Sequence, residues 1–504
     1  MTKSTISTIA VLGGGSAGFI VALTLKRRLP ETVVRVIRSP EIGIIGVGEG
    51  TTPYFLTHFH DYLKVSERLF FKEVEPIWKF GIRYQWGPRD FNYTFRPHTD
   101  QRLPELSRLA GCYFHEDFTD GELFSSLMDA ERGFPAGPGG MPGLMPGYAW
   151  HMENRKLVGF LENVARHAGV EIVDATVREV RQNDGGITGL VREDGTVETA
   201  DLYVDCSGFR SELLGQALGE RFISYEDTLF CDRSVVGGWE REEETLQAFT
   251  TAQTMDSGWC WRIDHEQIIN RGYVYSSAHI SDTAAEEEFR LANPKVKSTR
   301  VVKYRTGRYD RTWVKNTVAI GNSAGFVEPL EATALMVICN ESRALAESLA
   351  DGPPTPSRRR VYNEFVARYW DDIRDFLAVH YRFNGRLNTP FWQHCRNECV
   401  LHGAAGIVEW YQENGPSQIP RNVLLHPQNP FGLEGYYTLL LGQRVPYDGV
   451  HQPGAKEEAV LKTHRQQMRA AAARALTVPD CLAAMRSPQW RWGAAAPGPR
   501  HFTL

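Results

Sequence analysis

Lys79 is the residue whose surroundings most clearly suggest chemistry. It lies in the run Trp78-Lys79-Phe80-Gly81-Ile82-Arg83, inside a stretch from 76 to 86 that is otherwise largely apolar or aromatic. A lysine desolvated among such neighbours loses proton affinity and can act as a nucleophile or as a directed donor. The alternative is a solvated surface charge, which most lysines are.

Glu331 is a carboxylate in a turn that enters an apolar run, Leu335 to Leu349, predicted to be a helix. A carboxylate near a helix N-terminus interacts favourably with the helix dipole. Taken alone, these residues predict that Glu331 caps the helix.

Two tryptophans alternate in Gly258-Trp259-Cys260-Trp261-Arg262-Ile263-Asp264. Alternate residues of a strand point to the same face, so the two indoles should form one apolar wall. Core packing by two large aromatic side chains is the simpler reading of this segment.

The N-terminal segment has the pattern of a dinucleotide site. An apolar strand over Ile6 to Leu12, a glycine turn, a helix over Phe19 to Arg28 and a strand over Val33 to Arg38 follow one another. Glycines in G-x-G-x-x-G let the backbone approach a pyrophosphate, and the helix N-terminus attracts the phosphates. The alternative is a glycine-rich turn with no ligand. The predicted cofactor-binding residues of this turn are Gly13, Gly15, Ser16, Ala17 and Gly18.

Arg38 departs from the usual pattern of such sites. An acidic residue is expected ~20 residues after the turn to hold the ribose, but the strand ends in Arg38-Ser39. Arg38 could instead meet a phosphate or stack on adenine. A second strand-glycine-helix fingerprint is absent from the sequence, so a reduced cofactor should come from elsewhere.

The remaining pattern predicts an α/β fold. A hairpin-rich meander over 176–205 ends in Tyr203-Val204-Asp205-Cys206-Ser207-Gly208, which is similar to the second flavin-contacting strand of glutathione-reductase-like flavoproteins. The fold expected is therefore a parallel sheet with a Rossmann-type βαβ start, an antiparallel sheet and a mostly helical C-terminal module. The expected divisions are 1–355 for the catalytic body, 356–492 for the helical module and 493–504 for a disordered tail.

Composition narrows the classes of partner. The 504 residues are 42% hydrophobic and 23% charged, with a formal net charge of -5 and interspersed charges, which favours small molecules over nucleic acid or a membrane surface. The start lacks the apolar region of a signal peptide, and no stretch approaches the ~20 apolar residues of a membrane span. Eight irregularly spaced cysteines look like reduced thiols. A cytoplasmic enzyme is predicted.

One further cluster has residue types that bind metals. Cys395, Cys399 and His402 are spaced to share a helix face, with His394 nearby. Metal sites usually use C-x-x-C spacing or converging loops. Packing of a buried helix is the preferred interpretation, and no metal is predicted.

Together these motifs resemble the flavin-dependent tryptophan halogenases, over roughly residues 6 to 450. The run Gly46-Val47-Gly48-Glu49-Gly50-Thr51 is similar to the family's G-V-G-E-A-T-x-P, with Gly50 for alanine. The tryptophan segment resembles W-x-W-x-I-P, with Asp264 for proline, and Pro329 to Ala334 resembles P-L-E-S-T-G, with Ala332 and Ala334 for serine and glycine.

The resemblance assigns roles to individual residues. It implies that Lys79 and Glu331 are catalytic, that Thr333 and the amide of Ala334 bind halide, and that the Trp259 and Trp261 wall keeps substrate from the flavin. A loop at Gly48 and Glu49 would lie along the flavin, unless it is merely a tight connection, and the turn at Gly321 and Asn322 would close over it. Substrate-binding residues implied by position are Tyr93, where the family has histidine, Phe95, Tyr436, Tyr437 and Gln443.

The implied reaction uses reduced FAD from a separate flavin reductase, oxygen and chloride or bromide to make hypohalous acid. Lys79 would deliver this oxidant to an electron-rich aromatic such as an indole. Gln443 stands where an acid would hold the ammonium of tryptophan, so indole or a larger neutral aromatic is the expected substrate. A monomer or homodimer is expected. An FAD-dependent aromatic monooxygenase and a non-catalytic flavin-binding protein remain the alternatives.

Overall fold

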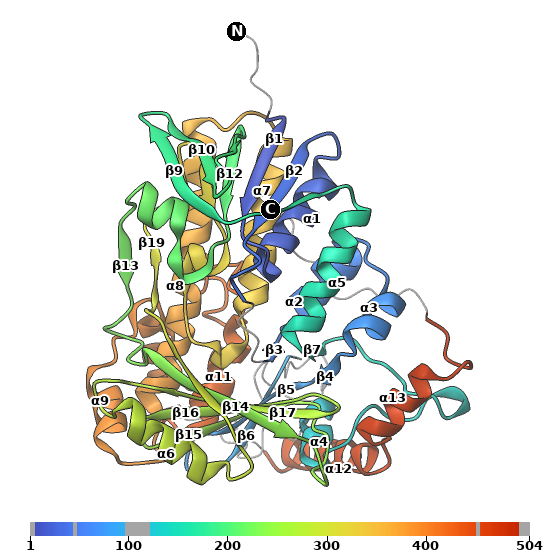
Figure 1. Ribbon diagram of the computed structural model, residues 1–504. Coiled ribbons are helices and arrows are strands. Elements are labelled where there is room, and N and C mark those ends of the chain that lie inside the picture. Colours follow the sequence, from blue (N-terminus) through green and yellow to red (C-terminus); the bar gives the residue numbers. More distant parts are fainter. Residues whose placement is uncertain (1–5, 44–47, 96–120, 450–453, 493–504) are drawn as a thin grey trace. The chain divides into compact units, whose positions relative to one another are not determined.

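The computed structural model describes residues 6–43, 48–95, 121–449 and 454–492 (Figure 1). The chain forms two compact units, each assembled from three separate stretches. Unit 1 comprises 1–75, 152–226 and 304–371, and unit 2 comprises 76–151, 227–303 and 372–504. The division at 355 expected from the sequence stays a prediction, and the tail 493–504 lies outside the described residues.

Unit 1 is built on a six-stranded sheet with the order β20-β21-β12-β1-β2-β8, in which the pairs from β21 to β8 are parallel. Only β20 runs antiparallel to its neighbour. The strands of this sheet are β1 (Thr8–Leu12), β2 (Val33–Arg38), β8 (Glu171–Asp174), β12 (Leu202–Asp205), β20 (Trp313–Val314) and β21 (Thr317–Ala319). The predicted strand-turn-helix-strand start is confirmed, since α1 (Ser16–Arg28) connects β1 to the parallel β2.

Apolar side chains explain this arrangement. β1 is buried along almost its whole length, as expected for a central parallel strand. Its Ala10 and Leu12 pack with Ile37 of β2, Tyr203 of β12 and Leu190 of a smaller sheet. That smaller sheet is the antiparallel meander predicted from the glycine turns: β9 (Val177–Asn183), β10 (Gly186–Arg192) and β11 (Val197–Glu198).

Helices complete unit 1, and α1 packs against both α5 and α7. The helices are α1, α2 (Pro53–Leu56), α3 (Glu67–Val74), α5 (Asn154–His167), α7 (Ala334–Ala350) and the first half of α8 (Pro356–Phe383). The remaining strands are β3 (Glu49–Gly50) and a three-stranded antiparallel sheet of β13 (Phe222–Ser224), β19 (Gly307–Tyr309) and β22 (Gly325–Phe326).

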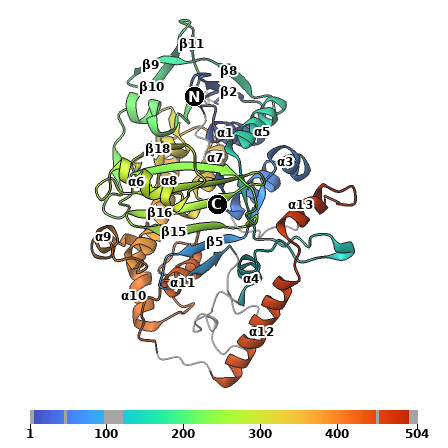
Figure 2. The same ribbon diagram turned by 60° about the horizontal axis from the view of Figure 1, so that its bottom comes forward.

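Unit 2 is built on a seven-stranded sheet with the order β18-β14-β17-β16-β15-β5-β6. Figure 2 shows β16, β15 and β5 side by side. All neighbours are antiparallel except β15 and β5. The strands are β5 (Gly81–Gln85), β6 (Phe91–Thr94), β14 (Arg233–Glu240), β15 (Thr250–Met255), β16 (Gly258–Asp264), β17 (Ile268–Tyr275) and β18 (Thr299–Lys303).

One face of this sheet packs against α6 (Asp282–Ala292), whose Phe289 and Ala285 contact Val235, Tyr273 and Tyr275. Outside this sheet, β4 (Ile77–Lys79) pairs antiparallel with β7 (Ala149–Met152). The helical C-terminal part predicted from the sequence is present. The helices of this part are the second half of α8, α9 (Pro390–Glu398), α10 (Ala405–Asn414), α11 (Gly432–Gly442), α12 (Ala455–Ala473) and α13 (Val478–Arg486). Unit 2 also contains α4 (Leu123–Asp129), from an earlier stretch of the chain.

Candidate active site

The glycine turn of unit 1 is shaped by close backbone contacts. Gly13 has φ +127, and a Cβ atom there would lie 2.2 Å from the carbonyl oxygen of Cys206, which follows β12. A Cβ atom on Gly18 would lie 1.9 Å from the carbonyl oxygen of Gly13. Both positions therefore require glycine, because any side chain would displace the turn or the strand beside it.

Gly15 differs from these two glycines. It is the N-cap of α1, and a Cβ atom there would meet nothing within 4 Å in the described part of the chain. The first turn of α1 begins with Ser16 and Ala17 and contains no acidic residue. Since the N-cap is a glycine, no N-cap side chain accepts a hydrogen bond from the backbone amides of this turn. Open space beside uncapped helix amides fits the pyrophosphate of a dinucleotide.

Arg38 ends β2 and lies beside this turn. Its Cβ atom would be 2.6 Å from a Cβ atom placed on Gly14. The guanidinium pairs with Glu162 at 2.5 Å and with Asp174 at 2.6 Å. Arg38 thus offers the turn its aliphatic stem, while two carboxylates hold its charged end.

The turn at Gly321 follows β21 and forms a 3₁₀ turn, Gly321–Ser323, that includes Asn322. Gly321 has φ +67, and its amide donates a 2.7 Å hydrogen bond to Oε2 of Glu341 in α7. The Trp370 indole donates to the other carboxylate oxygen at 2.9 Å. Burial raises the pKa of Glu341 to about 8, although these two donors act in the opposite direction. Sequence reasoning missed Glu341, whose signal is a glutamate on the buried side of an apolar helix.

The loop predicted at Gly48 and Glu49 is only partly described, because residues 44–47, directly before it, lie outside the described ranges. Gly48 has φ +78, a conformation that favours glycine. Glu49 is half-buried and begins β3.

Glu331 lies in a short 3₁₀ turn, Pro329–Glu331, and is 2% exposed. Ala332 then adopts a left-handed conformation with φ +53, which reverses the chain before α7. Thr333 is the N-cap of α7 and is buried, and its hydroxyl does not close over the first turn. α7 begins at Ala334, one residue before the predicted helix. Uncapped amides at this helix start could accept an anion.

Lys79, in unit 2, ends β4 and is fully buried. Its Nζ atom lies 5.1 Å from the centre of the Phe95 ring, which is within the range of a cation–π contact. The sequence-based prediction that Lys79 is desolvated among aromatic neighbours is confirmed. Lys79 belongs to unit 2, whereas Glu331 belongs to unit 1.

Aromatic rings from separate stretches of unit 2 gather around Phe376 of α8. Its ring centre lies 6.0 Å from that of Tyr93 and 5.0 Å from that of Tyr436. Phe431 stacks on it at 3.8 Å. Phe376 and Phe431 were not singled out from the sequence, because a phenylalanine within a helical or loop segment carries no local signal.

The other residues expected at the substrate have fixed partners. The Tyr437 hydroxyl donates to the Ser417 carbonyl at 2.6 Å. Gln443 directly follows α11, is buried, and donates from Nε2 to the Val379 carbonyl at 3.0 Å. Glu434, at the start of α11, pairs with Arg421.

Trp259 and Trp261 both lie on β16 and are buried, and alternation places them on one face. The Trp259 ring centre is 6.2 Å from that of Trp86. Trp261 lies over Gly272 of β17, where a Cβ atom would be 2.3 Å from the indole. The absence of a side chain at Gly272 therefore makes room for the ring.

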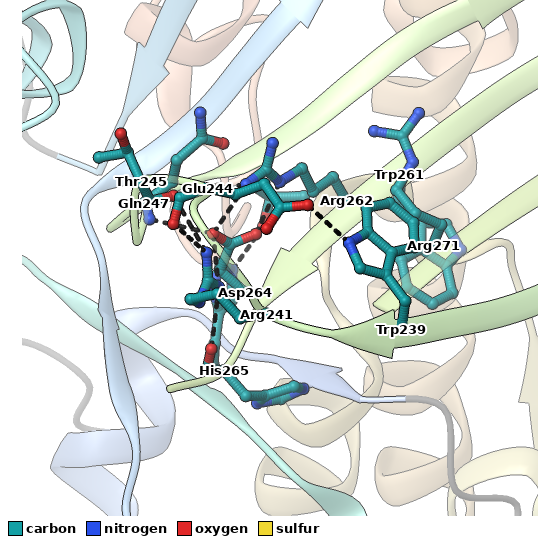
Figure 3. Close-up of polar contacts among 12 residues, drawn as sticks. Trp239, Arg241, Glu244, Thr245, Gln247, Trp261, Arg262, Asp264, His265 and Arg271 are labelled. Atoms are coloured by element: carbon teal, nitrogen blue, oxygen red, sulfur yellow. Dashed lines mark hydrogen bonds and ion pairs between the residues drawn. The ribbon is translucent and has the colours of Figure 1, made fainter. Parts of the chain in front are cut away.

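Asp264, at the end of β16, is fully buried and neutralised by arginines (Figure 3). Arg241 lies 2.9 Å and Arg262 lies 2.7 Å from its oxygens, and the Gln247 amide donates at 3.1 Å. This set of contacts is called the Asp264 clamp below. A buried carboxylate is tolerated here because two arginines pair with it and hydrogen bonds from Arg262 and the Gln247 amide satisfy its oxygens.

The predicted shared helix face of Cys395, Cys399 and His402 is wrong, since α9 ends at Glu398. His402 pairs instead with Asp227 at 3.0 Å. Within the described ranges, no group of three or more histidine, cysteine or acidic residues is arranged to hold a metal ion. The seven cysteines described there are free and buried.

Comparison with known proteins decides the family. The family model described as tryptophan halogenase matches residues 8–457. The chain belongs to the tryptophan halogenase family. Tryptophan 7-halogenase KtzQ of Kutzneria sp. (strain 744) is 32% identical over 83% of this chain and 84% of its own length. Tryptophan 6-halogenase SttH of Streptomyces toxytricini is 30% identical over 86% of this chain and 88% of its own length.

Solved structures agree with this assignment. The structure of MibH, described as a lathipeptide tryptophan 5-halogenase, superposes on this halogenase with a TM-score of 0.87 at 37% identity, over 95% of this chain and 93% of the other. The SttH structure gives 0.86 at 28% identity, over 95% and 100%. The protein is therefore a flavin-dependent halogenase, a class of enzymes that act on aromatic substrates. None of its described helices is long and apolar enough to cross a membrane.

Proposed function

We propose that this halogenase converts halide to hypohalous acid with reduced FAD and oxygen, and that Lys79 presents the oxidant to a neutral indole. The observation that carries the proposal is the fully buried lysine beside the Phe95 ring. A buried ammonium with restricted freedom can hold one small polar oxidant in one direction.

The FAD site proposed is the turn Gly13 to Gly18 with the amides of Ser16 and Ala17, the Arg38 stem, Gly48, Glu49, Gly321 and Asn322. Bound in reduced form, FAD supplies the two electrons with which oxygen and halide give hypohalous acid and water. Thr333 and the Ala334 amide would hold the halide at the start of α7. A separate flavin reductase would regenerate the reduced cofactor.

Lys79 would hold the hypohalous acid by a hydrogen bond or as a haloamine, which forms with loss of water. The ring then takes the halogen as a cation and loses the ring proton. Glu331 is the proposed base and stabiliser of the cationic ring, because a carboxylate can do both. Overall, aromatic C–H and hypohalous acid give aromatic C–halogen and water.

The proposed substrate is indole or a larger indole without a nearby ammonium. Gln443 carries no charge, and Glu434 is engaged by Arg421. Neither side chain is therefore ready to pair with the ammonium of free tryptophan. Tyr93, Phe95, Tyr436 and Tyr437 would supply the aromatic walls. The relative MibH, which acts on a lathipeptide, is consistent with a substrate in which the tryptophan amine is not free.

The test is to incubate the protein with a flavin reductase, FAD, a nicotinamide and either chloride or bromide, and to analyse a panel of aromatics by mass spectrometry. A halogen isotope pattern on an indole is expected. Hydroxylated products without halogen would favour a monooxygenase. FAD binding with no product under either halide would favour a non-catalytic flavoprotein.

A further inference from the structure

A buried histidine that the reaction above does not use lies on the strand paired with Lys79. In the antiparallel pair of β4 and β7, Ile77 faces His151 and Lys79 faces Ala149. Lys79 and His151 therefore share one face as diagonal neighbours, which in such ladders are roughly 7–8 Å apart and within reach of long side chains. Both side chains are fully buried.

The imidazole of His151 is anchored. Its Nε2 atom lies 2.8 Å from the Thr250 hydroxyl. Thr250 begins β15 and pairs with Ile82 of β5, the strand that follows Lys79 almost directly in the chain. The orientation of the His151 ring is thus fixed by β15, which pairs with β5, the strand that begins two residues after Lys79.

A second buried imidazole, that of His265, interacts electrostatically with His151 and lowers the affinity of His151 for a proton. His265 directly follows Asp264 and is held by its backbone. Arg241 donates to its carbonyl at 2.9 Å (Figure 3). The His265 amide donates to the Ile268 carbonyl at 2.9 Å. The clamp therefore fixes the position of His265.

His151 adds no second positive charge beside Lys79. Burial holds the pKa of His151 well below its ordinary value, the Lys79 charge and then His265 lower it further, and only the Asp264 backbone carbonyl acts in the opposite direction. His151 is thus neutral at ordinary pH. A second positive charge beside Lys79 would repel the ammonium, and the neutral ring does not.

We propose that His151 is a positioning residue for Lys79: a neutral imidazole, anchored on Thr250 and backed by the Asp264 clamp, that fixes the direction in which the lysine presents the oxidant. The proposal rests on the role proposed above for Lys79. If His151 has this role, the ratio of halogenated product to released hypohalous acid depends on it. The formation of hypohalous acid does not.

The test compares His151→Leu with His151→Gln in the full chain, supplied with reductase, FAD, bromide and indole. Glutamine places a polar atom close to the Nε2 position and can keep the bond to Thr250, whereas leucine cannot. Halogenated indole and free hypohalous acid, caught by a small diffusible trap, are measured together. Leucine should lower the product-to-oxidant ratio ~10-fold or more, because small misplacements of reacting groups are costly. Glutamine should restore it to within about 3-fold of the parent.

Two further variants keep the test decisive. Thr250→Val removes the anchor but keeps the imidazole, so it should lower the ratio to an intermediate value even if His151→Leu does not fold. His402→Gln, at the partly exposed histidine paired with Asp227, is the matched control and should leave the ratio unchanged.

A parent-like ratio in His151→Leu or in Thr250→Val would overturn the inference, as would equal losses of product and oxidant in the leucine and glutamine variants. Lys79→Ala is run beside them. If that variant keeps the parent ratio, the proposed role of Lys79 fails first. If only Lys79→Ala loses it, the inference on His151 fails alone.

Discussion

The candidate cofactor region of unit 1 is formed mainly by backbone atoms, whereas the lysine region of unit 2 is formed mainly by side chains. In unit 1 the backbone forms the surface: Gly13 and Gly18 are required by contacts closer than a Cβ atom permits. In unit 2 side chains form it: Lys79 meets Phe95, and Tyr93 meets Phe376 and Tyr436. Backbone sites depend on a few consecutive residues, whereas side-chain sites depend on strands and helices far apart in the chain.

The comparison predicts that the two regions can be disabled separately. Cofactor binding should follow the glycine turn, and the fate of the oxidant should follow the lysine and its aromatic neighbours. Damage to one region should leave the measurable property of the other in place.

Lys79→Ala should have the largest effect. Because the cofactor residues proposed lie in unit 1, FAD affinity should stay within about 2-fold of the parent, while halogenated indole falls ~1000-fold or more, the upper range for loss of a positioned catalytic group. FAD titration and mass spectrometry measure the two properties. Lys303→Ala, at an exposed lysine of unit 2, is the control. Halogenation at the parent rate and ring position would show that Lys79 is not the delivering residue.

Glu331→Gln keeps the shape of the side chain and removes its charge. Loss of a base or stabiliser of this kind commonly costs ~100-fold in rate. Halogenation rate is measured with FAD binding and circular dichroism as checks on the fold, and Glu347→Gln, which breaks the partly exposed pair with Arg28, serves as control. A rate within about 3-fold of the parent, with the fold intact, would mean that Glu331 serves only the helix start.

The third prediction concerns the substrate. Indole should have a higher kcat/KM than free tryptophan under one halide, because a missing buried ion pair is worth about 2–5 kcal/mol. Gln443→Glu should move the preference toward tryptophan. A clear preference of the parent for tryptophan would mean that another carboxylate, with Glu434 released from Arg421 as the first candidate, holds the ammonium.

The same difference explains what the sequence could predict. The strand, turn and helix around Gly13 follow from local steric and periodic patterns, and the structure confirms them. Lys79 was recognisable because its aromatic neighbours are adjacent in the chain. Phe376 and His151 were not, because each is an ordinary residue of a helix or strand whose importance comes from tertiary contacts. Asp264 was noticed only as a departure from a motif, and its arginine partner Arg241 comes from a different strand region.

The division into units was also not predictable from local patterns, because each unit is assembled by tertiary contacts. Each unit takes three stretches of chain, and the change to a helical pattern near Pro356 marks a change of local structure. α8 itself begins in unit 1 and ends in unit 2. Periodicity reports which residues form a helix, and it contains no information on which body buries that helix.

Glu341→Gln should have the smallest effect on halogenation at neutral pH, within about 3-fold, because glutamine can still accept the Gly321 amide. Its larger signature is in the pH dependence of stability. The ordinary pKa of the glutamate is 4.5, and in the folded chain burial raises it to about 8. Between these values the folded state keeps a proton that the unfolded state has lost, so stability present below the lower pKa is lost as pH rises toward the upper one. The slope is at most about 1.4 kcal/mol per pH unit.

Urea unfolding of parent and variant at several pH values from 5 to 9 measures this slope, with FAD affinity followed at each pH. The parent should lose stability between about 4.5 and about 8, and Glu341→Gln should lose less, since it has no proton to release. Glu347→Gln, whose carboxylate is paired near the surface, should keep the parent slope. If Glu341→Gln also keeps that slope, the carboxylate below the Gly321 turn is already ionised at neutral pH. The Gly321 turn would then be held by the negative charge of Glu341. In that case a charged side chain would shape the cofactor region as well as the lysine region, and the contrast between the two regions would be weaker.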